Sequence, residues 1–154
     1  MTGWRIGYAA SAAPGIIRAM SALLSHTTGS PNTAAQAAAE AALLGPQAET
    51  EAMRRTLLAR RDCMIRGLSR IQRIGYTVPQ GAFYVLADVR ALLGGAYADD
   101  GALALALLDG AGVATVPCTA FGAPGYLRLS FTLPEDRIAE GRERMRRFFE
   151  RMGE

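Results

Sequence analysis

The sequence contains no lysine, and all 17 of its basic residues are arginine. This absence excludes any reaction in which a lysine side chain of this chain supplies a nucleophilic amine. Cysteine is also scarce: Cys63 and Cys118 lie far apart, a spacing typical neither of a metal site nor of a disulfide framework. We therefore predict two free thiols and no metal centre.

The sequence also lacks a strong excess of charge and any long apolar run. A net charge of +3 on 154 residues is too small to indicate nucleic-acid binding. Acidic residues stand among the arginine pairs, which predicts solvated helix faces, with an anion-binding patch as the alternative. Glu40 and Asp109 end the longest apolar stretches well short of the roughly 20 residues of a membrane span. Without a signal-peptide pattern, a cytoplasmic protein with no membrane partner is expected.

What the sequence does contain is a regular alternation of helix and strand patterns in a chain that is half hydrophobic. Apolar spacing predicts helices from Pro14 to about Leu24, from a Ser30 cap to Leu44, over 47–74 and 101–110, and from a Thr132–Glu135 capping box to about Met152. Strands are predicted over 3–10, 82–87, 113–116 and 126–131. This order indicates an α/β (α+β) unit, a small sheet packed with helices. Periodicity alone assigns it no function.

Five motifs occur along the chain in a fixed order. They are Gly3-Trp4-Arg5-Ile6-Gly7, Ser25 to Gln36, Pro79-Gln80-Gly81-Ala82-Phe83-Tyr84, Val113 to Gly122, and Gly125-Tyr126-Leu127-Arg128-Leu129-Ser130-Phe131. Together they resemble the C-terminal stretch of a pyridoxal-phosphate-dependent aminotransferase of fold-type I, class I/II, similar to aspartate aminotransferase. The resemblance covers nearly the whole chain.

The resemblance implies a division of the chain into two parts. Residues 46–154 would be the C-terminal small domain of the aspartate aminotransferase fold, and residues 1–45 a remnant of the C-terminal end of the large cofactor-binding domain. The family's cofactor lysine would lie four residues before Met1. The chain is therefore expected to begin just after that lysine, either at a true start or by truncation, to contain no catalytic residue, and to hold no covalently bound cofactor.

The resemblance also implies roles for three side chains. Arg5 matches the arginine that binds the phosphate of pyridoxal 5'-phosphate, and Arg128 matches the one that binds the substrate's α-carboxylate. A guanidinium suits both anions because it is always charged and offers a planar fork of donors. Phe83 would line the substrate pocket, although core packing of Phe83 and Tyr84 is an equal alternative. Without the resemblance, both arginines are typical of exposed strand residues.

Two further expectations concern the backbone at the motifs. Gly81 is expected to permit a close backbone approach or an unusual dihedral angle. Cys118 stands where the family usually has glycine. If that position requires a positive φ, the cysteine adds strain of about 1–2 kcal/mol.

The function implied is transfer of an amino group between an amino acid and a 2-oxo acid, in a homodimer. The lysine-free chain alone is expected to be inactive. Three alternatives remain open: a stand-alone module that binds amino or oxo acids, an inactive structural remnant, and lyase chemistry of the same fold. A remnant would expose apolar surface on its first two helices.

Overall fold

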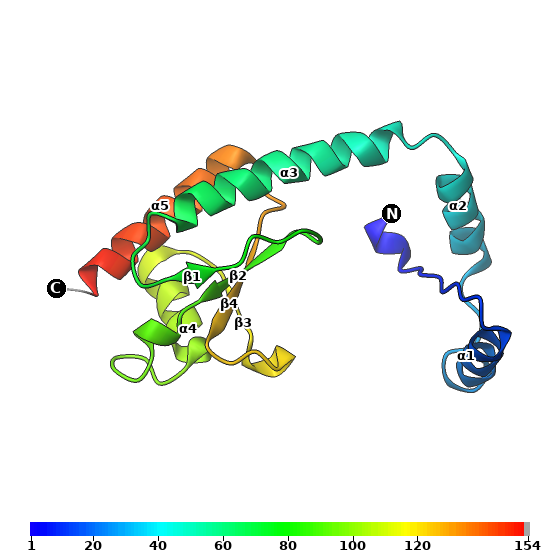
Figure 1. Ribbon diagram of the computed structural model, residues 1–154, viewed down its shortest axis with the longest axis horizontal. Coiled ribbons are helices and arrows are strands. Elements are labelled where there is room, and N and C mark those ends of the chain that lie inside the picture. The colour runs from blue at the N-terminus through cyan, green and yellow to red at the C-terminus, as the bar shows by residue number, and fades with distance from the viewer. Residues whose placement is uncertain (153–154) are drawn as a thin grey trace. The chain divides into compact units, whose positions relative to one another are not determined.

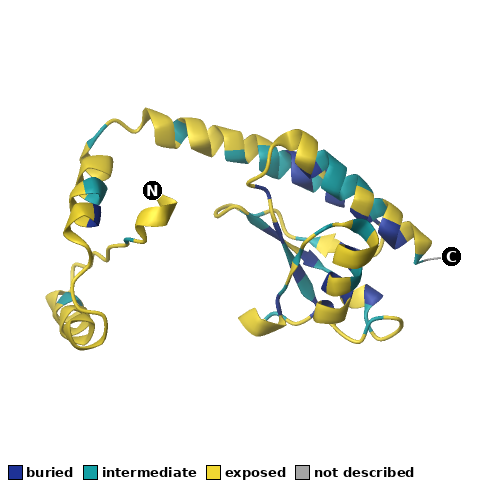
Figure 2. Ribbon diagram, turned by 180° about the vertical axis from the view of Figure 1, so that it is seen from behind, coloured by how far each residue is buried: buried dark blue, intermediate teal, exposed yellow. Residues whose placement is uncertain are grey.

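The computed structural model describes residues 1–152 and divides the chain into two compact units, of which the second begins at Ala52. The first unit contains a short 3-10 helix, η1 (Thr2–Trp4), and two helices, α1 (Pro14–Thr27) and α2 (Thr33–Leu44). Ala35 is the one buried residue of this unit, and nearly all of α1 and α2 is coloured as exposed in Figure 2. The apolar exposure expected of a remnant on these two helices is therefore present.

Two predictions for the first unit are wrong. Residues 3–10 form no strand: the chain leaves η1 through Arg5 at φ 49° and continues without regular structure. A strand needs a partner to satisfy its backbone groups, and all four strands of the described residues lie beyond residue 74. Helix α2 begins after Asn32 rather than Ser30, because the Asn32 side chain accepts a hydrogen bond of 3.0 Å from the backbone N–H of Ala35.

The second unit is a four-stranded antiparallel sheet with three helices. Its strands are β1 (Gly75–Tyr76), β2 (Tyr84–Asp88), β3 (Val116–Pro117) and β4 (Tyr126–Ser130), in the spatial order β1-β2-β4-β3. The helices are α3 (Ala48–Leu68), α4 (Asp100–Ala111) and α5 (Glu135–Arg151), and two 3-10 turns, η2 (Arg90–Leu92) and η3 (Thr119–Phe121), lie between them. The predicted small sheet packed with helices is confirmed.

One face of this sheet is the core and the other is open. Side chains alternate along a strand, so the buried Val85, Ala87, Leu127 and Leu129 share one face. These residues belong to one cluster with apolar side chains of α3, α4 and α5, so all three helices cover that face. The opposite face carries Arg128 and remains open in this chain.

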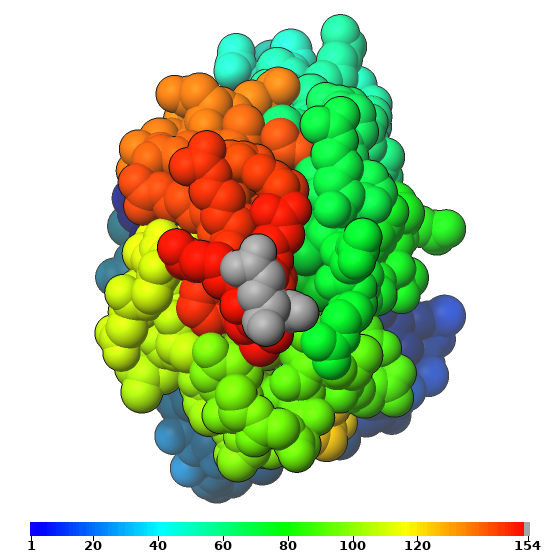
Figure 3. Space-filling model, turned by 90° about the vertical axis from the view of Figure 1, so that its left-hand side faces the viewer, coloured from blue at the N-terminus to red at the C-terminus, as the bar shows by residue number. Residues whose placement is uncertain are grey.

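Helices α3 and α5 run side by side over the core face (Figures 1 and 3). Arg142 of α5 lies across Gly67 of α3 and donates a hydrogen bond of 2.7 Å to the carbonyl of Cys63. The predicted helix over 47–74 is too long, because its apolar pattern continues into a turn where Ile71 still enters the core. Arg73 then adopts φ 65°, which turns the chain into β1.

The end of the chain confirms the last helix but not its expected cap. Helix α5 begins at Glu135 after Pro134, and no side chain caps it, so the predicted capping box is wrong. Instead, the Ser130 and Thr132 hydroxyls hydrogen-bond to each other at 3.0 Å. Within residues 1–152, no helix combines the length and the apolarity that crossing a membrane requires.

Candidate functional site

Arg128 lies at the centre of β4 on the open face of the sheet. It stands opposite Leu86 of β2 on one side and Val116 of β3 on the other. The neighbours Leu127 and Leu129 are buried, so the two-residue alternation predicted for 126–131 is confirmed. The side chain of Arg128 is therefore fixed at its base by three strands and faces away from the core.

The guanidinium of Arg128 rests on aromatic rings rather than on an acid. Its central carbon lies 4.5 Å from the ring centre of Tyr84 and 4.9 Å from that of Phe121. Arg128 is half-buried, yet it forms no ion pair within the described residues, unlike Arg90 or Arg146. A partly desolvated guanidinium held by two rings keeps its N–H donors available to an external anion.

The aromatic residues of the motif at 79–84 are not core residues, so that alternative is wrong. Phe83 is 37% exposed, and Tyr84 is half-buried on the open face beside Arg128. The two rings contact each other with centres 4.4 Å apart. Phe83 thus joins the Arg128 cluster through Tyr84.

The predicted backbone role of Gly81 is wrong, and the strain lies one residue later. A Cβ at Gly81 would meet no atom within 4 Å, and the residue has no positive φ. Ala82 instead adopts φ 57° just before β2. A left-handed alanine costs of order 1–2 kcal/mol and directs the chain into the strand that carries Tyr84.

The strain expected at Cys118 is absent, because its φ is −100°. The residue precedes η3, and its backbone N–H donates to the carbonyl of Tyr126 at 2.9 Å. Burial raises the pKa of the Cys118 thiol, although the positive charge of Arg128 opposes the rise. The thiol therefore stays protonated at neutral pH, and it donates to the carbonyl of Val116 at 3.6 Å.

Sequence reasoning missed the buried carboxylate beside this loop. Asp100, the first residue of α4, is 1% exposed and accepts hydrogen bonds from both the backbone N–H and the hydroxyl of Thr119. Burial opposes ionisation of Asp100, but the Thr119 hydrogen bonds outweigh it, so the pKa of the carboxyl is lowered. The sequence could not distinguish Asp100 from its neighbour Asp99, because either acid could cap the helix. In the structure Asp99 is the cap, and Asp100 is the buried carboxylate.

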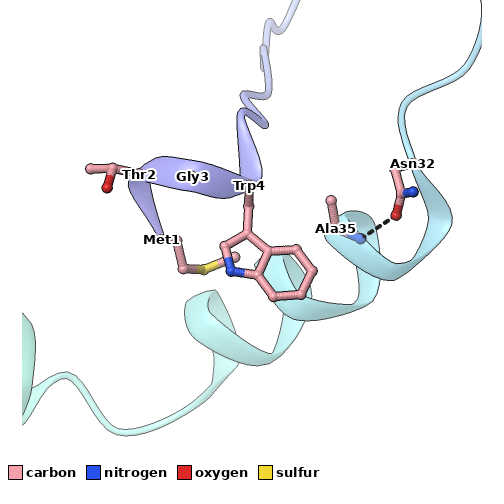
Figure 4. Close-up of a pocket in the computed structure, with 6 residues that line it drawn as sticks. All are labelled: Met1, Thr2, Gly3, Trp4, Asn32 and Ala35. Carbon is pink, nitrogen blue, oxygen red and sulfur yellow. Dashed lines mark hydrogen bonds between the residues drawn. The ribbon is translucent and has the colours of Figure 1, made fainter.

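Arg5 belongs to the first unit and lies exposed at the end of η1. The same unit contains a pocket of about 550 Å³, and Arg5 is not among its lining residues, which are Met1, Thr2, Gly3, Trp4, Asn32 and Ala35. Figure 4 shows the indole of Trp4 directed toward the first turn of α2, where Asn32 caps the helix. The side-chain oxygen of Asn32 is thus already engaged by the backbone of Ala35.

The residues present only partly fit pyridoxal phosphate. Its aldehyde requires a primary amine for covalent attachment, and no side chain of the sequence supplies one. Its phosphate requires a cation, for which Arg5 is exposed and available. Among the side chains of this chain, an exposed cation is therefore present and a primary amine is not.

Comparison with known proteins agrees with this geometry. The family model described as aminotransferase class I and II matches residues 1–145. Aspartate aminotransferase from Bacillus sp. (strain YM-2) is 45% identical over 149 residues, which are 96% of this chain and 38% of that protein. A probable aspartate/prephenate aminotransferase from Aquifex aeolicus is 40% identical over 155 residues, covering 97% of this chain and 38% of that protein.

Solved structures show the same relationship. The crystal structure of aspartate aminotransferase from Rhizobium meliloti matches 98% of this chain and 39% of its own, with a TM-score of 0.83 and 35% identity. The Thermus thermophilus aspartate aminotransferase with maleate matches 96% of this chain and 37% of its own, with a TM-score of 0.83 and 39% identity. The chain thus spans about 38% of the length of the curated relatives it matches. It belongs to the class I and II aminotransferase family.

Proposed function

We propose that this chain carries the carboxylate-binding part of an aminotransferase, with Arg128 as the residue that holds the α-carboxylate of an amino acid or a 2-oxo acid. One observation carries the proposal: Arg128 is half-buried against Tyr84 and Phe121 and has no acidic partner within residues 1–152. The planar guanidinium can donate two parallel hydrogen bonds to a carboxylate. Phe83 and Tyr84 supply an apolar border that limits competition by water.

The reaction of the whole protein is proposed to be amino transfer between an amino acid and a 2-oxo acid. Arg5 is proposed to bind the phosphate of pyridoxal 5'-phosphate. Its left-handed backbone supports this role, because strain of order 1–3 kcal/mol at a non-glycine residue clusters at ligand sites. Without a lysine the chain has no side-chain amine for the chemistry, and we propose that it is inactive by itself.

The setting of the protein is also a proposal. The apolar side chains exposed on the first unit, among them Ile16, Leu23 and Leu44, support assembly with further protein surface, which in a homodimer includes a second copy of the chain. A cytoplasmic location is proposed from the composition. Amino-acid metabolism is the context that the family suggests.

The carboxylate site is tested by titrating the purified chain with maleate, a dicarboxylate that lacks an amine. We expect Arg128→Leu to weaken binding about 10- to 100-fold, because a hydrogen bond to a charged group contributes about 1.5–3 kcal/mol. Arg137→Leu removes the same charge from an exposed pair with Glu140 and serves as the control. Equal binding by the parent chain and Arg128→Leu would contradict the proposal.

The cofactor proposal is tested by mixing the chain with pyridoxal phosphate, reducing with borohydride and weighing the intact protein. No covalent adduct is expected on a lysine-free chain. A stoichiometric adduct would have to lie on the N-terminal amine and would contradict the proposed lack of an attachment site. Turnover of an amino donor by the chain, purified free of host enzymes, would contradict its proposed inactivity.

A further inference from the structure

Phe121 contacts Arg128 from a segment that has little packing of its own. The ring is 62% exposed and belongs to the three-residue turn η3 between β3 and β4. Tyr84, the other ring on Arg128, is fixed by the central strand β2. The position of Phe121 therefore depends on what anchors η3.

The anchor of η3 is a buried charge on another element. Asp100 is the one buried charged residue in the described part of the chain. One carboxylate oxygen accepts from the Thr119 backbone N–H at 2.9 Å, and the other accepts from the Thr119 hydroxyl. Burying a carboxylate is costly unless hydrogen bonds compensate, and the two largest compensating bonds come from the first residue of η3, with smaller contributions from the backbone of Asp100 and Cys118.

Other bonds shape the turn without fixing it to α4. The carbonyl of Cys118 accepts from the backbone N–H groups of Phe121 and Ala123, and Gly122 closes the turn at φ 74°. These contacts are internal to residues 118–123. The Cys118 backbone N–H connects the start of the turn to β4 through the Tyr126 carbonyl, and the connection through Asp100 fixes the turn to α4 at a residue two positions from Phe121.

We propose that Asp100 and Thr119 are positioning residues for the carboxylate site, which they serve by holding Phe121 against the guanidinium of Arg128. With Phe121 in place, Arg128 loses rotamer freedom before the ligand arrives, so less entropy is lost on binding. The inference rests on the proposed role of Arg128. It assigns to Asp100 and Thr119 no contact with substrate or cofactor.

Thr119→Val is the sharpest test, because valine keeps the shape and the backbone N–H while removing the hydroxyl. Thr119 is exposed, so the substitution leaves the core intact, and Thr119→Ser is the matched control that restores the hydroxyl. Ring currents from Tyr84 and Phe121 shift the Arg128 side-chain proton resonances. We expect Thr119→Val to move these resonances toward those of a free arginine and to weaken maleate binding about threefold to tenfold, the scale of one cation–π contact.

A second variant shows whether Thr119 acts through Phe121. Phe121→Leu should weaken maleate binding to a similar extent, and Thr119→Val should add nothing in the Phe121→Leu background. Additive effects of the two substitutions would overturn the inference. Unchanged Arg128 resonances in Thr119→Val would overturn it as well, whatever the affinity.

The outcomes separate this inference from the proposed function. If Arg128→Leu abolishes maleate binding while Thr119→Val binds as the parent chain does, only the positioning role fails. If maleate binding does not depend on Arg128, the proposed function fails, and the Arg128 resonances still decide whether Thr119 positions Phe121.

Discussion

The two units of the chain differ in how much apolar surface they bury. The unit that begins at Ala52 has a continuous core of strand and helix side chains, whereas residues 1–51 bury Ala35 alone and leave large side chains such as Leu23 exposed. Fixing one residue's backbone costs about 1–2 kcal/mol, so helices without burial are only marginally stable. The comparison teaches that correct local helix patterns do not by themselves make a stable unit.

The largest difference is expected in amide hydrogen exchange of the intact chain. Backbone amides of β2, β4 and α4 should exchange only through global unfolding, with protection worth about 5–15 kcal/mol. Amides of α1 and α2 should show almost no protection, because their helices bury so little. Equal protection in the two units, measured by mass spectrometry on the monomeric chain, would refute the contrast.

A matched pair of leucine substitutions gives the next largest effect. Leu127 of β4 is fully buried, and Leu127→Ala should lower the free energy of unfolding by about 2–5 kcal/mol through the cavity it leaves. Leu23 of α1 is 64% exposed, and Leu23→Ala should change it by less than about 0.5 kcal/mol. Urea denaturation measures both, and similar losses would show that the first unit shares a core.

What the sequence could predict about the site depended on whether a feature is set by neighbours in the chain or by contacts between distant residues. The alternation of residues 126–131 placed Arg128 on the face away from the core, because that pattern depends only on neighbours in the chain. The link between Asp100 and Thr119 could not be predicted, because it joins elements whose contact depends on the folded arrangement. Neither residue forms part of a spacing pattern that indicates the other.

The fold shows the same limit at the ends of its elements. The helix at 101–110 and the strand at 126–131 were predicted within a residue of their observed bounds. The strand at 3–10 was not, because strand stability depends on pairing, and β1 was missed because two residues carry no periodicity. The helix over 47–74 was extended too far because burial of Ile71 mimics a further helical turn.

Alanine substitutions at two glycines with positive φ, one crowded and one in open space, distinguish the cost of backbone strain from the cost of displacing a neighbouring side chain. A Cβ at Gly125, with φ 81°, would lie 2.4 Å from Cγ of Arg90, which pairs with Asp88 at 2.6 Å. Gly125→Ala should therefore cost about 1–3 kcal/mol, because it adds displacement of Arg90 to the left-handed strain. Gly29, with φ 71° in the first unit, has open space, and Gly29→Ala should not shift the main unfolding transition. If Gly29→Ala shifted the unfolding transition as much as Gly125→Ala does, the two units would have to unfold together.

The smallest effect concerns acid stability and the buried carboxylate of the second unit. Thr119 donates two hydrogen bonds to Asp100, and these hold the pKa of the carboxyl below the ordinary value of 3.8 despite burial. A group with a lowered folded-state pKa contributes stability that is fully present above its unfolded pKa and lost as pH falls through the folded one. The second unit should therefore lose stability below about pH 4, more steeply than Asp100→Asn does.

Asp99, Cys118 and Arg128 are the other titratable or charged groups near this carboxylate. Asp99 adjoins Asp100 and caps α4, and the charges of Arg128 and Asp100 both act on the Cys118 thiol, which stays neutral in this range. Asp99→Asn is the matched control, because asparagine also caps helices and leaves the bonds to Thr119 intact. Urea midpoints measured between pH 3 and pH 7 should converge at low pH for the parent and Asp100→Asn. Parallel curves for these two proteins would mean that the pKa of Asp100 is the same in the folded and the unfolded chain, so the Thr119 bonds would not favour the charged carboxylate beyond the cost of burial.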